Sequence, residues 1–234
     1  MSQHGFLTGR TTGVLPFLEF GLGDDRLGGA KMTYLDSNIA MKVVDSVKDD
    51  YKVQLSTYHS AWMAKTSFKQ DSFRRIQPYH LTGNWKVYGD DKYDYVTVAL
   101  DERLPYKSIQ EVNPSRIIVD VFGVTSNTNW ITQLSTTKEI KNAYYEQTED
   151  DVFRIVIELR HQQHWGYFIY YDSTSSSLVV RVKRQPKILT PQHLLVAIDA
   201  GHGGSNTGAG GAISGIAEKD YTNNVARIPV VIPP

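Results

Sequence analysis

Cysteine is absent from all 234 residues of the chain. Without thiols the chain cannot form disulfide bonds, and a metal site cannot use thiolate ligands. A metal ion would therefore have to be held by histidine and by carboxylate oxygens. The lack of disulfides does not identify the compartment, so this question stays open.

An excess of charge of either sign is also lacking, because 25 Lys and Arg residues balance 25 Asp and Glu residues. Nucleic-acid-binding proteins normally carry a basic surplus, so no nucleic-acid partner is expected. No apolar run is long enough to cross a bilayer, so no membrane span is expected. The first residues, MSQHGFLTGR, lack the basic-then-apolar pattern of a signal peptide. Either the protein is not exported, or its native N-terminus is missing from this sequence.

Helical periodicity is weak before residue 215, and strand signals dominate instead. Tyrosine, with 14 copies against 8 Phe and 4 Trp, suits half-buried strand positions. Alternation predicts strands at Met41–Val44, Tyr51–Leu55, Tyr95–Leu100, Arg116–Phe122, Val152–Arg160, Trp165–Tyr171 and Leu178–Val182. Turns are expected at 46–50, 113–115 and 172–177. The chain is therefore predicted to be mainly β.

The strands and breakers divide the chain into blocks. Residues 1–80 hold a Gly-rich lead and short strands, and residues 85–184 hold the longer strands. Pro186 and Pro191 mark a linker over 185–193, because proline removes a backbone donor and restricts its neighbour. Residues 194–234 form a third block of different character.

The third block carries the strongest chemical signal. A predicted strand, Leu194–Ile198, runs into Asp199-Ala200-Gly201-His202-Gly203-Gly204, and Glu218 follows at the start of a predicted helix. Loops at the carboxyl edge of a sheet are common ligand sites in α/β folds. His202 and Glu218 are of the residue types that bind zinc. On spacing alone, a tight glycine turn with a polar histidine is the more common explanation.

Two nucleotide-binding patterns fail on the same loop. A Walker loop needs Lys-Ser/Thr after its second glycine, but Ala209 and Gly210 follow Gly208. A dinucleotide fingerprint needs glycine where Asn206 or Ile213 stands. Neither a phosphate-binding loop nor a dinucleotide fold is therefore predicted.

Four further candidates each have an alternative explanation that involves no ligand. His161 and His164 could bind a metal, but solvated histidines in a hairpin turn are favoured, since the sequence places no carboxylate or third histidine nearby. Arg181-Val182-Lys183-Arg184 could contact anionic polymers, but charges that protect an edge strand are favoured. Tyr58 and Trp62 could line a ligand groove, and core packing is at least as common. Asp199 could orient the histidine loop beside a metal or cap a turn, with equal weight.

The strings VAIDAGHGG and EKD together resemble the opening of the zinc-dependent N-acetylmuramoyl-L-alanine amidases, which cleave peptidoglycan. The resemblance implies that His202 and Glu218 bind zinc in an α/β catalytic domain. It implies hydrolysis of the amide between the lactyl group of N-acetylmuramic acid and L-alanine, through a zinc-activated water and a glutamate base.

The preceding blocks are similar to modules found before such catalytic domains. Residues 85–184, with NPSRIIVDVFG, resemble AMIN-type β domains, and residues 39–63 resemble part of an SH3-like barrel. The resemblance implies peptidoglycan as partner, a periplasmic or envelope location, and a regulator protein of the envelope as a further partner.

The sequence departs from the amidase pattern after Glu218. No histidine follows His202, and Glu218 is the last glutamate, whereas the family places a third zinc ligand and its catalytic glutamate further downstream. The expectation is a truncated catalytic domain without activity of its own. The alternative is a non-catalytic wall-binding protein that uses residues 1–184. The weakest hypothesis is a carbohydrate-binding module for soluble glycans, which only the aromatic content suggests.

Overall fold

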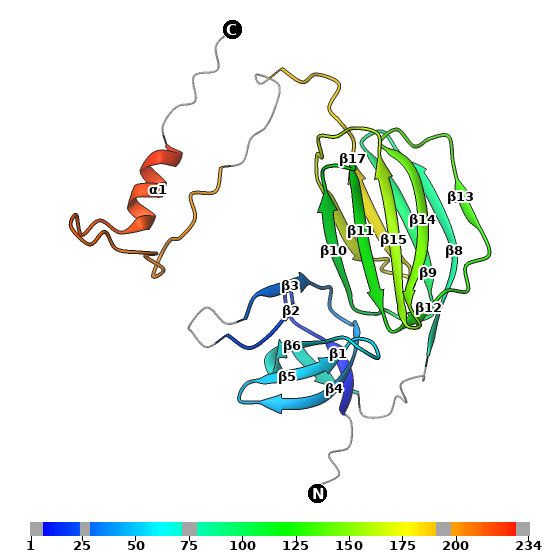
Figure 1. Ribbon diagram of the computed structural model, residues 1–234, viewed down its shortest axis with the longest axis horizontal. Coiled ribbons are helices and arrows are strands. Elements are labelled where there is room, and N and C mark those ends of the chain that lie inside the picture. The colour runs from blue at the N-terminus through cyan, green and yellow to red at the C-terminus, as the bar shows by residue number, and fades with distance from the viewer. Residues whose placement is uncertain (1–6, 24–28, 72–78, 191–197, 228–234) are drawn as a thin grey trace, which may run out of the picture. The chain divides into compact units, whose positions relative to one another are not determined.

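The protein is mainly β, and its chain divides into two compact units, residues 1–185 and 186–234 (Figure 1). The structure, a computed structural model, describes residues 7–23, 29–71, 79–190 and 198–227. Within these residues no helix is long and apolar enough to cross a membrane.

The N-terminal part of the first unit is a seven-stranded sheet that curls into a half-barrel. Its order is β3-β2-β6-β5-β4-β1-β7. Its strands are β1 (Leu7–Thr11), β2 (Phe17–Glu19), β3 (Lys31–Tyr34), β4 (Ala40–Val47), β5 (Asp50–Gln54), β6 (Ser60–Ala64) and β7 (Phe68–Gln70), with a 3-10 turn, η1 (Lys65–Ser67), before β7. Leu18, Ile39, Met41, Val53 and Met63 are almost completely buried and supply the core of this sheet.

Two further sheets follow and pack face to face. The first has the order β10-β11-β15-β14, and the second has the order β12-β8-β9-β17-β16 with β13 paired to β8. Their strands are β8 (His80–Gly89), β9 (Tyr93–Leu100), β10 (Tyr106–Glu111), β11 (Arg116–Phe122), β12 (Val124–Thr125), β13 (Ile131–Gln133), β14 (Ile140–Glu149), β15 (Val152–Leu159), β16 (Tyr167–Tyr171) and β17 (Leu178–Lys183). All pairings are antiparallel except those of β12 and β13 with β8.

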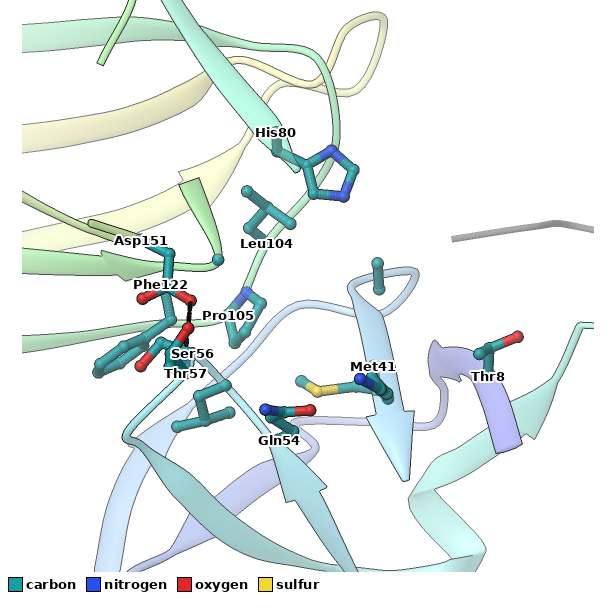
Figure 2. A pocket seen from close by; sticks show the side chains of 14 residues that line it. Thr8, Met41, Gln54, Ser56, Thr57, His80, Leu104, Pro105, Phe122 and Asp151 are labelled. Carbon is teal, nitrogen blue, oxygen red and sulfur yellow. Dashed lines mark hydrogen bonds between the residues drawn. The ribbon is translucent and has the colours of Figure 1, made fainter. Parts of the chain in front are cut away.

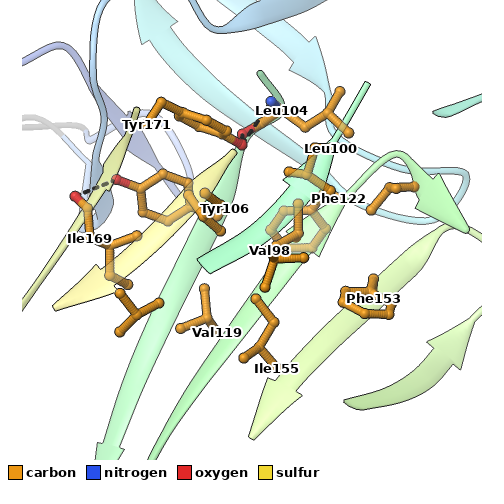
Figure 3. Close-up of a cluster of buried hydrophobic side chains, with 14 of the residues drawn as sticks. Val98, Leu100, Leu104, Tyr106, Val119, Phe122, Phe153, Ile155, Ile169 and Tyr171 are labelled. Carbon is orange, nitrogen blue, oxygen red and sulfur yellow. Dashed lines mark hydrogen bonds between the residues drawn. The ribbon is translucent and has the colours of Figure 1, made fainter. Parts of the chain in front are cut away.

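The sandwich core lies between these two sheets (Figure 3). Successive residues of a strand point to opposite faces, so alternate apolar residues meet in the middle. Val98, Val119, Phe153 and Ile155 come from both sheets and are fully buried. The predicted apolar face of 152–160 is confirmed, because Phe153, Ile155, Ile157 and Leu159 are all buried.

The seven predicted strands are confirmed, with shifts of a few residues at their ends. The turn between β4 and β5 is tighter than the predicted 46–50, since β4 ends at Val47 and β5 begins at Asp50. The hairpin loop at 172–177 and the turn at 113–115 lie where predicted. Strands β8 and β14, each of ten residues, were not predicted.

The prediction that Arg181–Arg184 protects a sheet edge is wrong. Strand β17 lies inside its sheet, because it pairs with β16 on one side and with β9 on the other. Both rows of backbone donors and acceptors are therefore satisfied within the sheet, and no edge needs protection.

Polar contacts join the half-barrel to the sandwich within the first unit. Arg10 makes a two-pronged ion pair with Glu102, with Nη–Oε distances of 3.1 and 2.7 Å. The Asp151 carboxylate accepts from the backbone N–H and the hydroxyl of Thr57 at 2.7 and 2.9 Å. His59 Nε2 lies 2.8 Å from Glu149 Oε1. These contacts make the two β parts one compact body.

The second unit is mostly irregular where it is described. Its helix is α1 (Glu218–Ala226), which confirms the helix predicted to start near Glu218. The predicted strand Leu194–Ile198 lies outside the described residues except for Ile198, which is not in a strand. None of the described residues of this unit is buried. The described residues of this unit, 186–190 and 198–227, show no α/β domain.

Candidate functional site

The glycine-rich loop brings His202 and Glu218 together. His202 Nε2 lies 3.4 Å from Glu218 Oε2, although Glu218 comes sixteen residues after His202 in the chain. Glu218 is the first residue of α1, and its Oε2 accepts from the backbone N–H of Ala209 at 2.9 Å. The loop thus positions the carboxylate against the imidazole.

The hydrogen bonds of Asn206 define which ring nitrogen of His202 is protonated. Asn206 Oδ1 accepts from the backbone N–H of Gly208 at 3.2 Å, so this atom is an oxygen acceptor. His202 Nδ1 lies 3.3 Å from the same oxygen and must donate to it. The lone pair of Nε2 in the neutral ring then points toward a carboxylate oxygen. In that form of the ring, Nε2 and Oε2 both present lone pairs to the space between them.

Gly208 permits this close approach. Its φ is +66°, a conformation that favours glycine. A Cβ at this position would lie 2.7 Å from Glu218 Oε2 and 2.9 Å from His202 Cδ2. A side chain at 208 would therefore push the histidine and the carboxylate apart.

The donor set fits part of a zinc shell. Ligand atoms on one tetrahedral zinc ion lie roughly 3.4 Å apart, given metal–ligand distances of about 2.1 Å. The separation of Nε2 and Oε2 matches that value. A catalytic zinc takes three protein ligands, and the described part of the chain contains no group of three or more His, Asp, Glu or Cys residues that could hold a metal. The two residues are thus an incomplete ligand set.

The structure places Asp199 in the turn before the histidine. Its Oδ1 accepts from the backbone N–H of Gly201 at 3.0 Å. Aspartate side chains commonly accept in this way from the backbone N–H two residues further along the chain, which stabilises a turn. It supports the turn, and through the turn the position of the next residue, His202.

His161 and His164 hold the loop before β16. His161 Nδ1 lies 2.7 Å from Glu139 Oε2, whose side chain is 3% exposed, and His164 Nε2 lies 3.0 Å from Ser115 Oγ. The expectation that no carboxylate is near is wrong for His161. The turn interpretation still holds, because each ring has a structural partner.

Tyr58 and Trp62 lie in different surroundings. Tyr58 is 80% exposed, in the tight turn between β5 and β6, so core packing is wrong for it. Trp62 lies in β6 and is half-buried, with Lys52 Nζ 5.9 Å from its ring centroid.

A cavity of about 520 Å³ lies in the first unit between the half-barrel and the sandwich (Figure 2). Met41, Leu104 and Phe122 form apolar parts of its wall, and Gln54 and His80 add polar groups. Its size is that of a small-molecule site. Asp151, also in the wall, keeps Oδ1 buried and without a hydrogen-bond partner among the described residues. That oxygen is buried within the wall, so the polar groups given to a ligand are those of Gln54 and His80.

Residues 181–184 have separate roles. Arg184 Nε binds the fully buried Asp94 at 2.7 Å, while Arg181 projects from the outer surface of the sandwich. A segment that reads as one basic patch is thus split between a buried ion pair and a surface group.

Comparison with known families gives a match over the sandwich. Residues 84–182 match the model of the AMIN domain. This match confirms the AMIN-type prediction for 85–184, and AMIN domains occur in peptidoglycan amidases and in proteins of the periplasm and envelope. No curated protein matches the chain.

Proposed function

We propose that residues 1–185 bind peptidoglycan and hold the protein at the cell wall, in the periplasm or envelope. The observation that carries this proposal is the AMIN domain at 84–182, a domain that is consistent with peptidoglycan binding. The half-barrel, which resembles an SH3-like module in sequence, is joined to the AMIN domain by the ion pair of Arg10 with Glu102. The two modules therefore act as one binding body in this proposal.

Sedimentation with purified sacculi tests this function. The full chain should pellet with sacculi in a saturable manner, at physiological salt, and remain in the supernatant with cellulose. A chain that stays in solution with sacculi at every concentration would refute the proposal. The controls are a heat-unfolded sample and an unrelated neutral protein of similar size.

A second candidate function rests on the approach of His202 Nε2 to Glu218 Oε2 at 3.4 Å. We propose that these two residues belong to the zinc shell of an N-acetylmuramoyl-L-alanine amidase. Bound zinc would activate a water and polarise the substrate carbonyl. In this chain Asn206 orients the imidazole by accepting from Nδ1, and the Ala209 N–H holds the carboxylate. An envelope regulator protein remains an expectation of the amidase resemblance.

Zinc binding tests this second function independently of activity. Titration of the full chain with zinc, followed by calorimetry, should show one site that weakens at least about tenfold in His202→Ala and in Glu218→Gln. Gly208→Ala should weaken it similarly, because the added Cβ would separate the two ligands. The control His164→Gln should bind zinc like the wild type. Equal affinity in all variants would disprove the assignment, whatever the result with sacculi.

A further inference from the structure

One surface of the AMIN domain carries aromatic side chains in a straight row. Strand pairing places Tyr88 beside Tyr95, Tyr95 beside Arg181, and Arg181 beside Phe168. Their sequence neighbours, such as Val87, Val96, Val180 and Ile169, are buried in the sandwich core. Because side chains alternate along a strand, the row projects from the outer face of the sheet.

The rings of this face lie close together and partly in solvent. Tyr88 and Tyr95 are stacked, with centroids 5.1 Å apart and planes 16° apart, and Phe168 stacks on Tyr170 at 5.9 Å. Phe168 is 53% exposed. Neighbouring strands are about 4.8 Å apart, so a row across four strands is roughly 15 Å long. We call Tyr88, Tyr93, Tyr95, Phe168, Tyr170 and Arg181 the aromatic face.

Arg181 gives the aromatic face a positive charge at its centre. Its guanidinium carbon lies 4.7 Å from the Tyr93 centroid and 5.8 Å from the Phe168 centroid. Its Nε is buried and makes no hydrogen bond within the described parts of the chain, so a ligand can meet the guanidinium only through its Nη groups. Stacked guanidinium groups that retain free donors are suited to carboxylates. Lys86, 5.1 Å from the Tyr88 centroid, adds a second cation.

The opposite surface of the sandwich carries a row of charged side chains where this one carries aromatic rings. There the row across the other sheet is Lys107, Asp120, Arg154 and Glu146, with alternating charges. Arg154 binds Asp120 through two hydrogen bonds of 2.7 and 3.1 Å, and Lys107 Nζ lies 3.6 Å from the same carboxylate. Those charges satisfy one another. The outward positions of β8, β9, β16 and β17 hold no carboxylate to do the same for Arg181.

We propose that the aromatic face binds a glycan strand that carries carboxylates. The apolar C–H faces of successive sugar rings pack on the row of aromatic rings, and Arg181 donates to a carboxylate of the strand. This inference rests on the proposed wall-binding function and specifies which part of peptidoglycan is bound. Strands whose peptides have been removed expose the lactyl carboxylates of muramic acid, and they are the ligand that fits best.

Titration of the full chain with peptide-free glycan strands tests the assignment, with chitin oligosaccharides as neutral sugars. The wild type should prefer the glycan strands. Phe168→Ala should weaken binding of both ligands at least about fivefold, because the variant loses one ring that packs on a sugar. Arg181→Gln should remove the preference for the anionic strands and leave chitin binding unchanged. Tyr144→Ala, on the opposite surface of the sandwich, is the matched control and should bind like the wild type.

Three results would overturn the inference. One is wild-type affinity in both variants when their circular dichroism and melting match the wild type. Another is tighter binding of single-stranded oligothymidylate, because rows of aromatic rings with cations also stack on bases. The third is binding to sacculi without binding to the glycan strands, which would leave the wall-binding function intact. Binding to glycan strands without binding to sacculi would instead refute the wall-binding function and support the aromatic face.

Discussion

Asp94 anchors several parts of the AMIN domain through a single carboxylate. Its side chain is fully buried, and Oδ2 accepts from the backbone N–H groups of Lys138, Glu139 and Ile140 at 2.7 to 2.8 Å. Its Oδ1 accepts from Arg184. A buried charge is tolerated only when its hydrogen bonds are made, and Asp94 makes four.

Removal of this carboxylate should destabilise the domain strongly. Asp94→Ala leaves three backbone donors and a partly buried arginine without a partner, and we expect a loss of about 3 kcal/mol or more in the free energy of unfolding. Urea denaturation followed by tryptophan fluorescence measures it. Asp91→Ala, in the exposed turn nearby, should change stability by less than about 0.5 kcal/mol. Similar values for the two variants would disprove the anchoring role.

At the scale of secondary-structure elements, buried tyrosines join loops to strands. Tyr171 of β16 accepts from the Leu104 N–H at 2.8 Å and donates to the Leu104 carbonyl at 2.6 Å, which fastens the loop between β9 and β10 (Figure 3). Tyr106 of β10 donates to the Ile169 carbonyl at 3.2 Å. Burial raises the pKa of Tyr171 well above its ordinary value, and burial also raises the pKa of Tyr106.

These raised pKa values predict a loss of stability in alkali. In the unfolded chain the phenols ionise near pH 10, while in the folded protein they stay protonated. The stabilisation is thus complete below about pH 10 and falls as the pH rises further. Urea midpoints at pH 8, 10 and 11 should show the fall. Tyr171→Phe should lower stability by about 1–3 kcal/mol at pH 8 and flatten the alkaline slope. Tyr58→Phe, at an exposed ring, should leave both unchanged.

The sequence predicts a strand correctly where the strand contains many apolar residues. Strand β11, Arg116–Phe122, has six buried residues in seven and was predicted at its observed bounds. Strand β14 has mostly polar, exposed residues, and only Ile140 and Ala143 are buried. Its place is held by backbone pairing to β15, with register shifts that interrupt any regular alternation. Local patterning could not reveal it, because its stability comes from its neighbour.

At the level of the whole molecule, burial is concentrated in the first unit. Residues 1–185 contain the entire set of buried core residues, while no described residue from 186 to 227 is buried. Apolar side chains of the second unit, such as Ile213, Tyr221 and Val225, are at least half exposed. Hydrophobic burial is the main stabilising contribution to folding, so the first unit should carry the stability of the described chain.

Removal of residues 186–234 should therefore leave the first unit folded. We expect its thermal midpoint to change by less than about 2 °C, which corresponds to less than about 1 kcal/mol in the free energy of unfolding. The reason is that no described residue of the removed segment is buried. Circular dichroism near 218 nm measures the transition for the full and the shortened chain. A fall of more than about 5 °C would contradict the independence of the first unit.

The motif residues and the strand periods could be read from the order of the amino acids alone. The mainly β class follows from local patterns, because strand period is a local property of a chain. The AMIN segment and the pairing of His202 with Glu218 as candidates came from motifs that resemble those of known families. Partnership between distant residues is not local. Only the tertiary structure could separate Arg184, buried against Asp94, from Arg181 on the aromatic face. Which side of a sheet a residue faces, and what lies across from it, depends on strand register and on the order of strands in the sheet.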